Sequence, residues 1–239
     1  YMSSVVSRFA NSFAPDLWSR SKFSILIGLF TFACFMLGEL PTLFLLVLIG
    51  VLSAREMLRA MLRTYKNHGI GDKLIKSSVI CISSLIGYAY SIVYLKDSSL
   101  FVEIIAILTI TIWATDSGAY FAGKSLSKKF PAKLAPRYSP NKTWIGALGG
   151  GLAGIVAFYS LWEIYIPIEN NMIFVIFIAF IAIYASMAGD IMQSYCKRAA
   201  QMDDSGGLLG GHGGVWDRYD AFFVLTAMFA VMAKIVLFL

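Results

Sequence analysis

Seven apolar stretches, each near the length that crosses a lipid bilayer as a helix, constrain the fold of this chain more than any other feature. A membrane-spanning helix needs about 20 predominantly apolar residues. We place the stretches at 22–38, 41–60, 74–95, 100–123, 143–166, 171–189 and 219–239. Only 14% of the residues are charged, against roughly 25% in soluble domains. The sequence therefore predicts an all-α, polytopic integral membrane bundle of about seven transmembrane helices, folded as a single membrane domain over 1–239.

The second stretch is apolar over its first part and then becomes basic. Arg55, Arg59 and Arg63 follow one another at a spacing of four, which places them on one face of a helix. We expect this helix to continue out of the bilayer for one or two basic turns, with its arginines against solvent or lipid headgroups.

Positive charge alternates between the loops. Of the 20 lysines and arginines, 18 lie in the N-terminal arm or in the loops after the second, fourth and sixth stretches, together with the edges of those loops. Lysine and arginine gather on the cytoplasmic side of membrane proteins. The pattern predicts a cytoplasmic N-terminus, an external C-terminus and both long polar loops in the cytoplasm. A net charge of +6 on that side suits anionic lipids and anionic substrates, and not nucleic acid.

The polar run 189–220 separates the last two apolar stretches and is the first candidate for chemistry. It contains five of the 14 acidic residues, His212 and six glycines within positions 206–214. Asp190, Ser194 and Lys197 would lie on one face of a continuing helix. Glycine amides ahead of a helix can surround phosphate oxygens. The run therefore predicts a site for phosphate groups.

Carboxylates stand towards both ends of this run. Asp190 closes the sixth stretch and Asp217 opens the last helix, with Lys197, Arg198 and Arg218 in the same run. Hard divalent ions prefer carboxylate oxygens and share their remaining positions with substrate phosphates. We therefore expect Mg²⁺, as one ion or two, at Asp190 and Asp217, in a site for phosphate transfer.

A second polar cluster spans 116–143. Asp116 lies inside an otherwise apolar stretch, where a charge is costly enough to indicate function. The segment 139–143 has the composition of a turn that enters the fifth helix, and its Lys142 can reach a phosphate as a point charge. We expect the catalytic loops and helix ends to lie in 116–143 and 189–220.

Together these motifs resemble those of the phosphatidate cytidylyltransferase, or CDP-diacylglycerol synthase, family. The resemblance rests on SYCKRAAQMDDSGGLLGGHGGVWDRYD at 194–220, DSGAYFAGK at 116–124, SPNKT at 139–143 and the Gly-Asp pair at 189–190. It implies a magnesium-dependent attack of a phosphatidic acid phosphate oxygen on the alpha phosphorus of CTP, giving CDP-diacylglycerol and pyrophosphate. The implied setting is the bacterial inner membrane, with CTP, phosphatidic acid and membrane lipids as partners and a homodimer left open.

The resemblance also implies roles for individual residues. Those expected to be catalytic are Asp190, Lys197, Arg198, His212 and Asp217, of which Asp190 and Asp217 bind the metal. Those expected to bind substrate are Ser194, Asp204, Arg218, Asp220, Lys142 and Asp116. The chain departs from the usual family pattern where Asp203 replaces lysine, Gly210 replaces proline, and Gln193 and Ile145 replace glutamate.

Two other functions fit parts of the pattern. A polyprenol or lipid kinase of similar membrane architecture would share the nucleotide and magnesium requirement but differ in its acceptor. A cation transporter would also hold acidic residues near glycines in membrane helices. The acidic residues here gather towards one membrane face and not at the midplane, which favours the enzyme.

Overall fold

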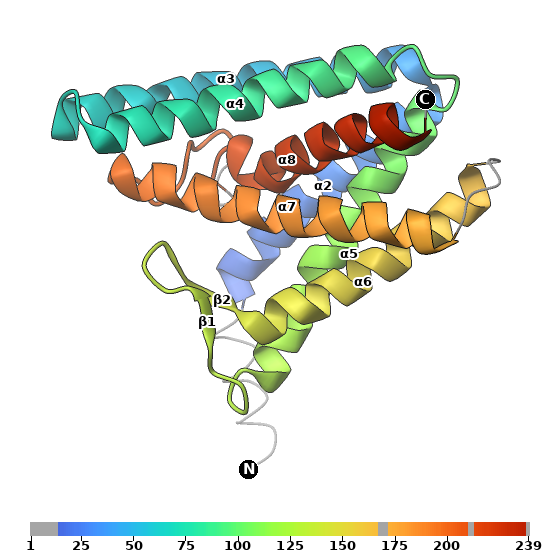
Figure 1. The fold of residues 1–239 in the computed structure, drawn as a ribbon. Helices are drawn as coiled ribbons and strands as arrows, with labels where there is room; N and C mark the ends of the chain where they lie inside the picture. The colour runs from blue at the N-terminus through green and yellow to red at the C-terminus, as the bar shows by residue number, and fades with distance from the viewer. Residues whose placement is uncertain (1–13, 167–171, 210–212, 238–239) are drawn as a thin grey trace.

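The computed structural model describes residues 14–166, 172–209 and 213–237, with side chains described within 25–235. Seven α-helices account for most of this part of the chain (Figure 1). They are α2 (Ala14–Leu37), α3 (Glu39–His68), α4 (Asp72–Leu95), α5 (Phe101–Leu126), α6 (Trp144–Tyr165), α7 (Met172–Ala199) and α8 (Trp216–Met232), and a π-helical turn, η2 (Ala233–Leu237), follows α8. The predicted membrane-type helical bundle is confirmed.

Length and apolar composition suit five of these helices, α3 to α7, to crossing a membrane. In α2 the part whose side chains are described, Ile25–Leu37, is apolar but shorter than these spans, and α8 has 17 residues before the π-helical turn. Large apolar side chains on the outside of the bundle, such as Leu29 and Phe44, are more than half exposed, as expected of surfaces that face lipid.

The predicted and observed helix boundaries differ most at the start of α2, which begins at Ala14, and at the ends of α3 and α7. Helix α3 runs to His68 and α7 runs to Ala199, so each continues well past the apolar stretch that predicted it. The basic extension of the second helix was predicted, and it is confirmed. The turn from α3 to α4, the loop after α7 and the α5–α6 connection lie towards one end of the molecule (Figure 1). These are the connections that contain the alternating positive charge.

A two-stranded antiparallel hairpin joins α5 to α6. Its strands are β1 (Lys133–Ala135) and β2 (Ser139–Thr143), and Lys133 pairs with Thr143. The sequence predicted only a turn at 139–143, because two short strands without apolar alternation leave no periodic signal. The hydroxyl of Thr143 accepts a hydrogen bond from the Gly146 amide and caps α6. The hairpin therefore ends at the start of α6, with Lys142 one residue before the cap.

Small residues let α5 and α6 pack backbone against backbone. A Cβ atom added at Gly118 would lie 2.6 Å from the Cβ of Ala153, and one at Gly150 would lie 2.7 Å from the carbonyl oxygen of Thr115. Close approach of this kind is typical of helix pairs in membranes. It brings the hairpin and the polar end of α5 together, and so sets one side of the site described next.

Candidate functional site

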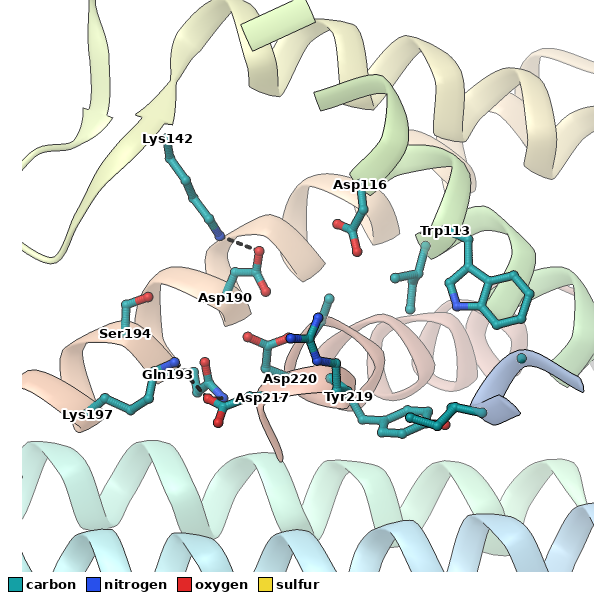
Figure 2. Close-up of a pocket in the computed structure, with 15 residues that line it drawn as sticks. Trp113, Asp116, Lys142, Asp190, Gln193, Ser194, Lys197, Asp217, Tyr219 and Asp220 are labelled. Atoms are coloured by element: carbon teal, nitrogen blue, oxygen red, sulfur yellow. Dashed lines mark hydrogen bonds and ion pairs between the residues drawn. The ribbon is translucent and has the colours of Figure 1, made fainter. Parts of the chain in front are cut away.

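A cavity of about 560 Å³ lies among α2, α5, α7, α8 and the hairpin, and most of the predicted site residues line it (Figure 2). Eight of the eleven are present: Asp116, Lys142, Asp190, Ser194, Lys197, Asp217, Arg218 and Asp220. Residues that are far apart in the chain thus meet at one place, which only the packing of the helices can bring about.

Helix α7 supplies one wall of this cavity. Asp190, Ser194 and Lys197 all line it, as expected for spacings of four and three on a helix that continues through Ala199. Close packing against α8 fixes this wall, because a Cβ atom added at Gly189 would lie 2.5 Å from the Val224 side chain. The wall therefore has a defined distance from the first turn of α8.

Asp217 is the most firmly held carboxylate of the cavity, with 7% of its side chain exposed. One oxygen accepts from Lys197 Nζ at 2.7 Å and from Gln193 Nε2 at 3.2 Å. The other lies 2.7 Å from the amide nitrogen and 2.9 Å from the hydroxyl of Ser205, and 2.9 Å from the amide of Gly214. Five contacts exceed the roughly four lone-pair sites of a carboxylate.

These donors also set the ionisation of Asp217, in the polar first turn of α8 ahead of its apolar part. Burial opposes the charged form, but the hydrogen bond from Lys197 and those from the Gly214 and Ser205 amides outweigh it and lower the pKa of Asp217 below its usual value. Asp217 is therefore an anion that organises the residues around it.

Asp190 is held differently, from across the cavity. Its carboxylate forms an ion pair with Lys142 of the hairpin and accepts a hydrogen bond from the Lys142 ammonium group (Figure 2). Its side chain, 21% exposed, also faces the carboxyl group of Asp220 on α8, with which it interacts directly. Asp116 points towards the same space from α5, where Lys142 and Arg218 supply the nearby positive charge. Three carboxyl groups thus meet two cations at the centre of the cavity.

A second cavity, of about 620 Å³, lies between α5, the hairpin and α6. It contains more lysine than the first, with Lys124, Lys133 and Lys142 in its wall. Both cavities share Asp116, Lys142 and Asp190. A molecule in each cavity would therefore meet the other at these three residues.

Two predicted site residues, Arg198 and Asp204, are not among those that line the two cavities. The Arg198 guanidinium donates to Asp203 at 2.7 Å on the exposed side of α7. Asp204 is exposed beside Gly213, whose left-handed backbone conformation (φ 82°) places the two residues together. His212 lies outside the described residues. The catalytic and binding roles of these three residues stay predictions.

The amides that begin α8 have partners within the protein. Gly214 donates to Asp217, and the amides of Val215 and Trp216 donate at 3.1 and 2.9 Å to Glu56 of α3. The sequence predicted that amides of this loop surround a substrate phosphate, but in this structure these three bind carboxylates of the protein itself. The partial positive charge at the N-terminus of a helix favours a nearby anion. At α8 the carboxylates of Glu56 and Asp217 supply it.

Sequence reasoning missed Glu56. The row of arginines at 55, 59 and 63 was the basis of the prediction for this helix. Glu56 lies on the other face of α3, with the buried residues Ser53, Met57 and Ala60. A charge on the apolar face of a helix was the available signal. Gln193, noted only as a departure from the family pattern, turns out to be a direct donor to Asp217.

The arrangement also bears on the expected magnesium ion. Among the described residues, no group of three or more His, Cys, Asp or Glu side chains is placed so that together they could hold a metal ion. Asp190 and Asp220 offer adjacent carboxyl oxygens, the donors that Mg²⁺ prefers, and a cation would offset their repulsion. Asp217 would have to exchange one of its donors for the ion. The residues therefore fit an ion at Asp190 and Asp220 more directly than at Asp190 and Asp217.

Comparison with known proteins agrees with the motifs. The profile of the Cytidylyltransferase family matches residues 73–236. The phosphatidate cytidylyltransferase of Bacillus subtilis is 39% identical over 126 residues, covering 52% of this chain and 45% of the relative. That of Haemophilus influenzae is 37% identical over 130 residues, covering 51% and 42%, and that of Rickettsia felis is 41% identical over 121 residues, covering 48% and 52%. The chain spans about half the length of these curated relatives. It belongs to the cytidylyltransferase family.

Proposed function

We propose that this protein transfers the cytidylyl group of CTP to phosphatidic acid, giving CDP-diacylglycerol and pyrophosphate. The observation that supports this most is the pair of cavities that meet at Asp116, Lys142 and Asp190. A polar nucleotide and a lipid phosphate need separate binding cavities that meet where the two substrates react. Family membership and relatives named phosphatidate cytidylyltransferase support the same choice.

The proposed bond changes are few. A phosphate oxygen of phosphatidic acid forms a bond to the alpha phosphorus of CTP, while the bond from that phosphorus to the oxygen bridging to the beta phosphate breaks. The electron pair leaves with pyrophosphate. The attacking phosphate is already an anion, so it needs no strong general base, and the protein contributes alignment and neutralisation of charge.

The charged residues around Asp190 have proposed parts in this alignment. Lys142, shared by both cavities, would turn from Asp190 towards a phosphate oxygen when substrate enters. Lys197, held by Asp217, and Arg218 would neutralise charge that develops on pyrophosphate. A Mg²⁺ ion held by Asp190 with Asp220 or Asp217 would polarise the phosphate oxygens when bound.

The lipid has a proposed entrance on the apolar side of the first cavity. Ile27 of α2 and Ile112 and Trp113 of α5 line this cavity. Both helices are apolar there, so acyl chains can remain in the bilayer while the phosphate reaches the carboxylates. We further propose that the site faces the cytoplasm of a bacterial inner membrane, where CTP is present. Labelling of single cysteines placed in the hairpin, from each side of the membrane, tests this orientation.

The function is tested with labelled CTP and phosphatidic acid in detergent, with and without a chelator. We expect a CMP-linked lipid from the wild type, and a loss of about 100-fold or more in Asp190→Asn, the scale seen when a preorganised charge is removed from an active site. Asp97→Asn, the same change at an exposed turn between α4 and α5, is the matched control and should leave turnover unchanged.

Other outcomes would reject the proposal. A phosphorylated alcohol as the product would identify a lipid kinase, and nucleotide-independent metal flux in liposomes would identify a transporter. Wild-type turnover by a folded Asp190→Asn protein would show that Asp190 is not part of the active site.

Binding of Mn²⁺ as a magnetic probe to Asp217→Asn and Asp220→Asn would show which of these two carboxylates holds the ion with Asp190.

A further inference from the structure

Glu56 is a buried carboxylate that stands apart from the residues of the cavity. It lies on α3 with 4% of its surface exposed, and it is the only Asp, Glu, Lys or Arg in the buried class among the residues whose side chains are described. It accepts hydrogen bonds from the Ser205 hydroxyl at 2.7 Å and from the amides of Val215 and Trp216. A buried charge is stable only with such partners.

The described parts of the α7–α8 loop, 200–209 and 213–215, are shaped around this carboxylate. A Cβ atom added at Gly206 would lie 2.6 Å from one oxygen of Glu56, and one added at Gly214 would lie closer still to the other oxygen. Any side chain at either position would push the loop away from α3. These two glycines are therefore explained by the approach of Glu56, and need no bound phosphate.

A single hydroxyl connects Glu56 to the cavity. Ser205 Oγ lies 2.7 Å from Glu56 and 2.9 Å from Asp217, and it has one proton, so it donates to one carboxylate at a time. The other oxygen of Asp217 holds Lys197 at 2.7 Å. The contacts thus run from Glu56 through Ser205 and Asp217 to Lys197 in the cavity wall.

Helix α3 holds the beginning of the same loop as well. Asn67 Nδ2 lies 3.1 Å from the carbonyl oxygen of Ala200, and His68 Nε2 lies 3.1 Å from that of Ala199. These residues are about three turns along α3 from Glu56. The basic extension of α3 is therefore a rigid support that binds the loop at both ends.

We propose that Glu56 is a positioning residue for the transfer reaction, which fixes Asp217, and through it Lys197, by way of Ser205 and the first amides of α8. Glu56 touches neither of the two cavities, and it lies outside residues 73–236, which match the family profile. The inference rests on the proposed function. It adds a residue of α3 to a site otherwise built from α2, α5, the hairpin, α7 and α8.

The test compares Glu56→Gln with Glu39→Gln, the same substitution at the exposed start of the same helix. Glutamine keeps the size of the side chain but replaces one acceptor by a donor, which opposes the donors of the loop. We expect kcat per folded molecule to fall by about 10- to 100-fold, the scale of a small misplacement in an active site. The KM for phosphatidic acid should stay unchanged, and Glu39→Gln should match the wild type.

Two further measurements separate positioning from a general loss of fold. Hydrogen exchange of the 205–217 amides should accelerate in Glu56→Gln while α5 and α6 remain as protected as in the wild type. Ser205→Ala removes only the connecting hydroxyl and should lower kcat by itself. In the double variant the loss should be smaller than the product of the two single losses, because both act through one path.

The outcomes distinguish this inference from the proposed function. No turnover by the wild type would reject the function, and the hydrogen exchange would still test Glu56. Wild-type kcat in Glu56→Gln, or a lower melting temperature with unchanged kcat per folded molecule, would overturn the positioning role. Unchanged exchange at 205–217 would overturn it as well. If Glu56→Gln does not fold, wild-type kcat and wild-type exchange in Ser205→Ala overturn it.

Discussion

The two sides of the cavity are built by different means. On the side of the α7–α8 loop, Glu56 is buried, Asp217 has 7% of its side chain exposed, and both are bound by several backbone and side-chain donors. On the side of the hairpin, Asp190 and Lys142 contact one another from elements far apart in the chain, and both side chains are more than one-fifth exposed. Asp190 also faces the carboxyl group of Asp220.

The difference separates a fixed part of the site from an adjustable one. Hydrogen bonds to backbone amides hold the loop side before any substrate arrives, which is the condition for preorganised catalysis. The partly exposed ion pair across the cavity is weak by comparison and can exchange for substrate phosphates or a cation. We expect loop-side substitutions to change stability and hairpin-side substitutions to change substrate use.

The largest expected contrast is between two aspartates. Asp217→Asn leaves Lys197, with only 15% of its side chain exposed, without its anion and should lower the free energy of unfolding by about 3 kcal/mol. Asp190→Asn relieves repulsion with Asp220 and should change it by less than about 1 kcal/mol. Denaturant unfolding in detergent micelles measures both. Equal losses of stability would contradict the division into a fixed and an adjustable side.

The glycines of the α7–α8 loop sharpen the comparison within the fixed side. Gly214→Ala places a methyl group against Glu56 and Ser205 and should cost about 2 kcal/mol by overpacking, with a parallel loss of turnover. Gly207→Ala is the matched control, because its Cβ atom meets nothing within 4 Å. Thermal unfolding and turnover are measured for both. A tolerated alanine at 214 would show that the loop does not depend on close contact with α3.

Lys142 tests the adjustable side. Lys142→Gln removes the cation that both cavities share, so kcat/KM for CTP should fall by about 10-fold, on the scale of one charge-assisted hydrogen bond. The melting temperature should stay within a degree or two of the wild type, about what a partly exposed ion pair contributes. Lys128→Gln, in the same connection but lining neither cavity, should behave as the wild type. A large loss of stability in Lys142→Gln would show that the hairpin belongs to the fixed part of the site and not to the adjustable part.

Gln193 should give the smallest effect. Gln193→Glu replaces a neutral donor to Asp217 by a second carboxylate, and Lys197 lies close enough to Asp217 to offset part of the added charge. We expect less than about a threefold decrease in kcat, corresponding to under about 1 kcal/mol. Steady-state turnover beside the exposed control Gln201→Glu measures it. A loss as large as that of Asp190→Asn would mean that the neutral amide is essential.

Much of the fold follows from local sequence. About seven transmembrane helices were predicted from apolar length. Seven helices are present in the described part of the chain, five of them long and apolar enough to cross a membrane, and the ends of α4 and α6 lie within two residues of the prediction. The hairpin was not predicted, since short polar strands have no periodic pattern. Eight of eleven predicted site residues line one cavity. Arg198 instead pairs with Asp203, and half of its side chain is exposed.

The sequence by itself determined the membrane helices, the alternating charge and the identities of the acidic and basic residues, because apolar length and motif composition are local properties. Only the tertiary structure decided which groups meet. In the folded protein the amides of the α7–α8 loop donate to Glu56 and Asp217. Lys142 pairs with Asp190, and Asp220 lies beside Asp190. These contacts join residues up to 160 positions apart. Their geometry follows from how closely α3, α7 and α8 pack, which no local pattern encodes.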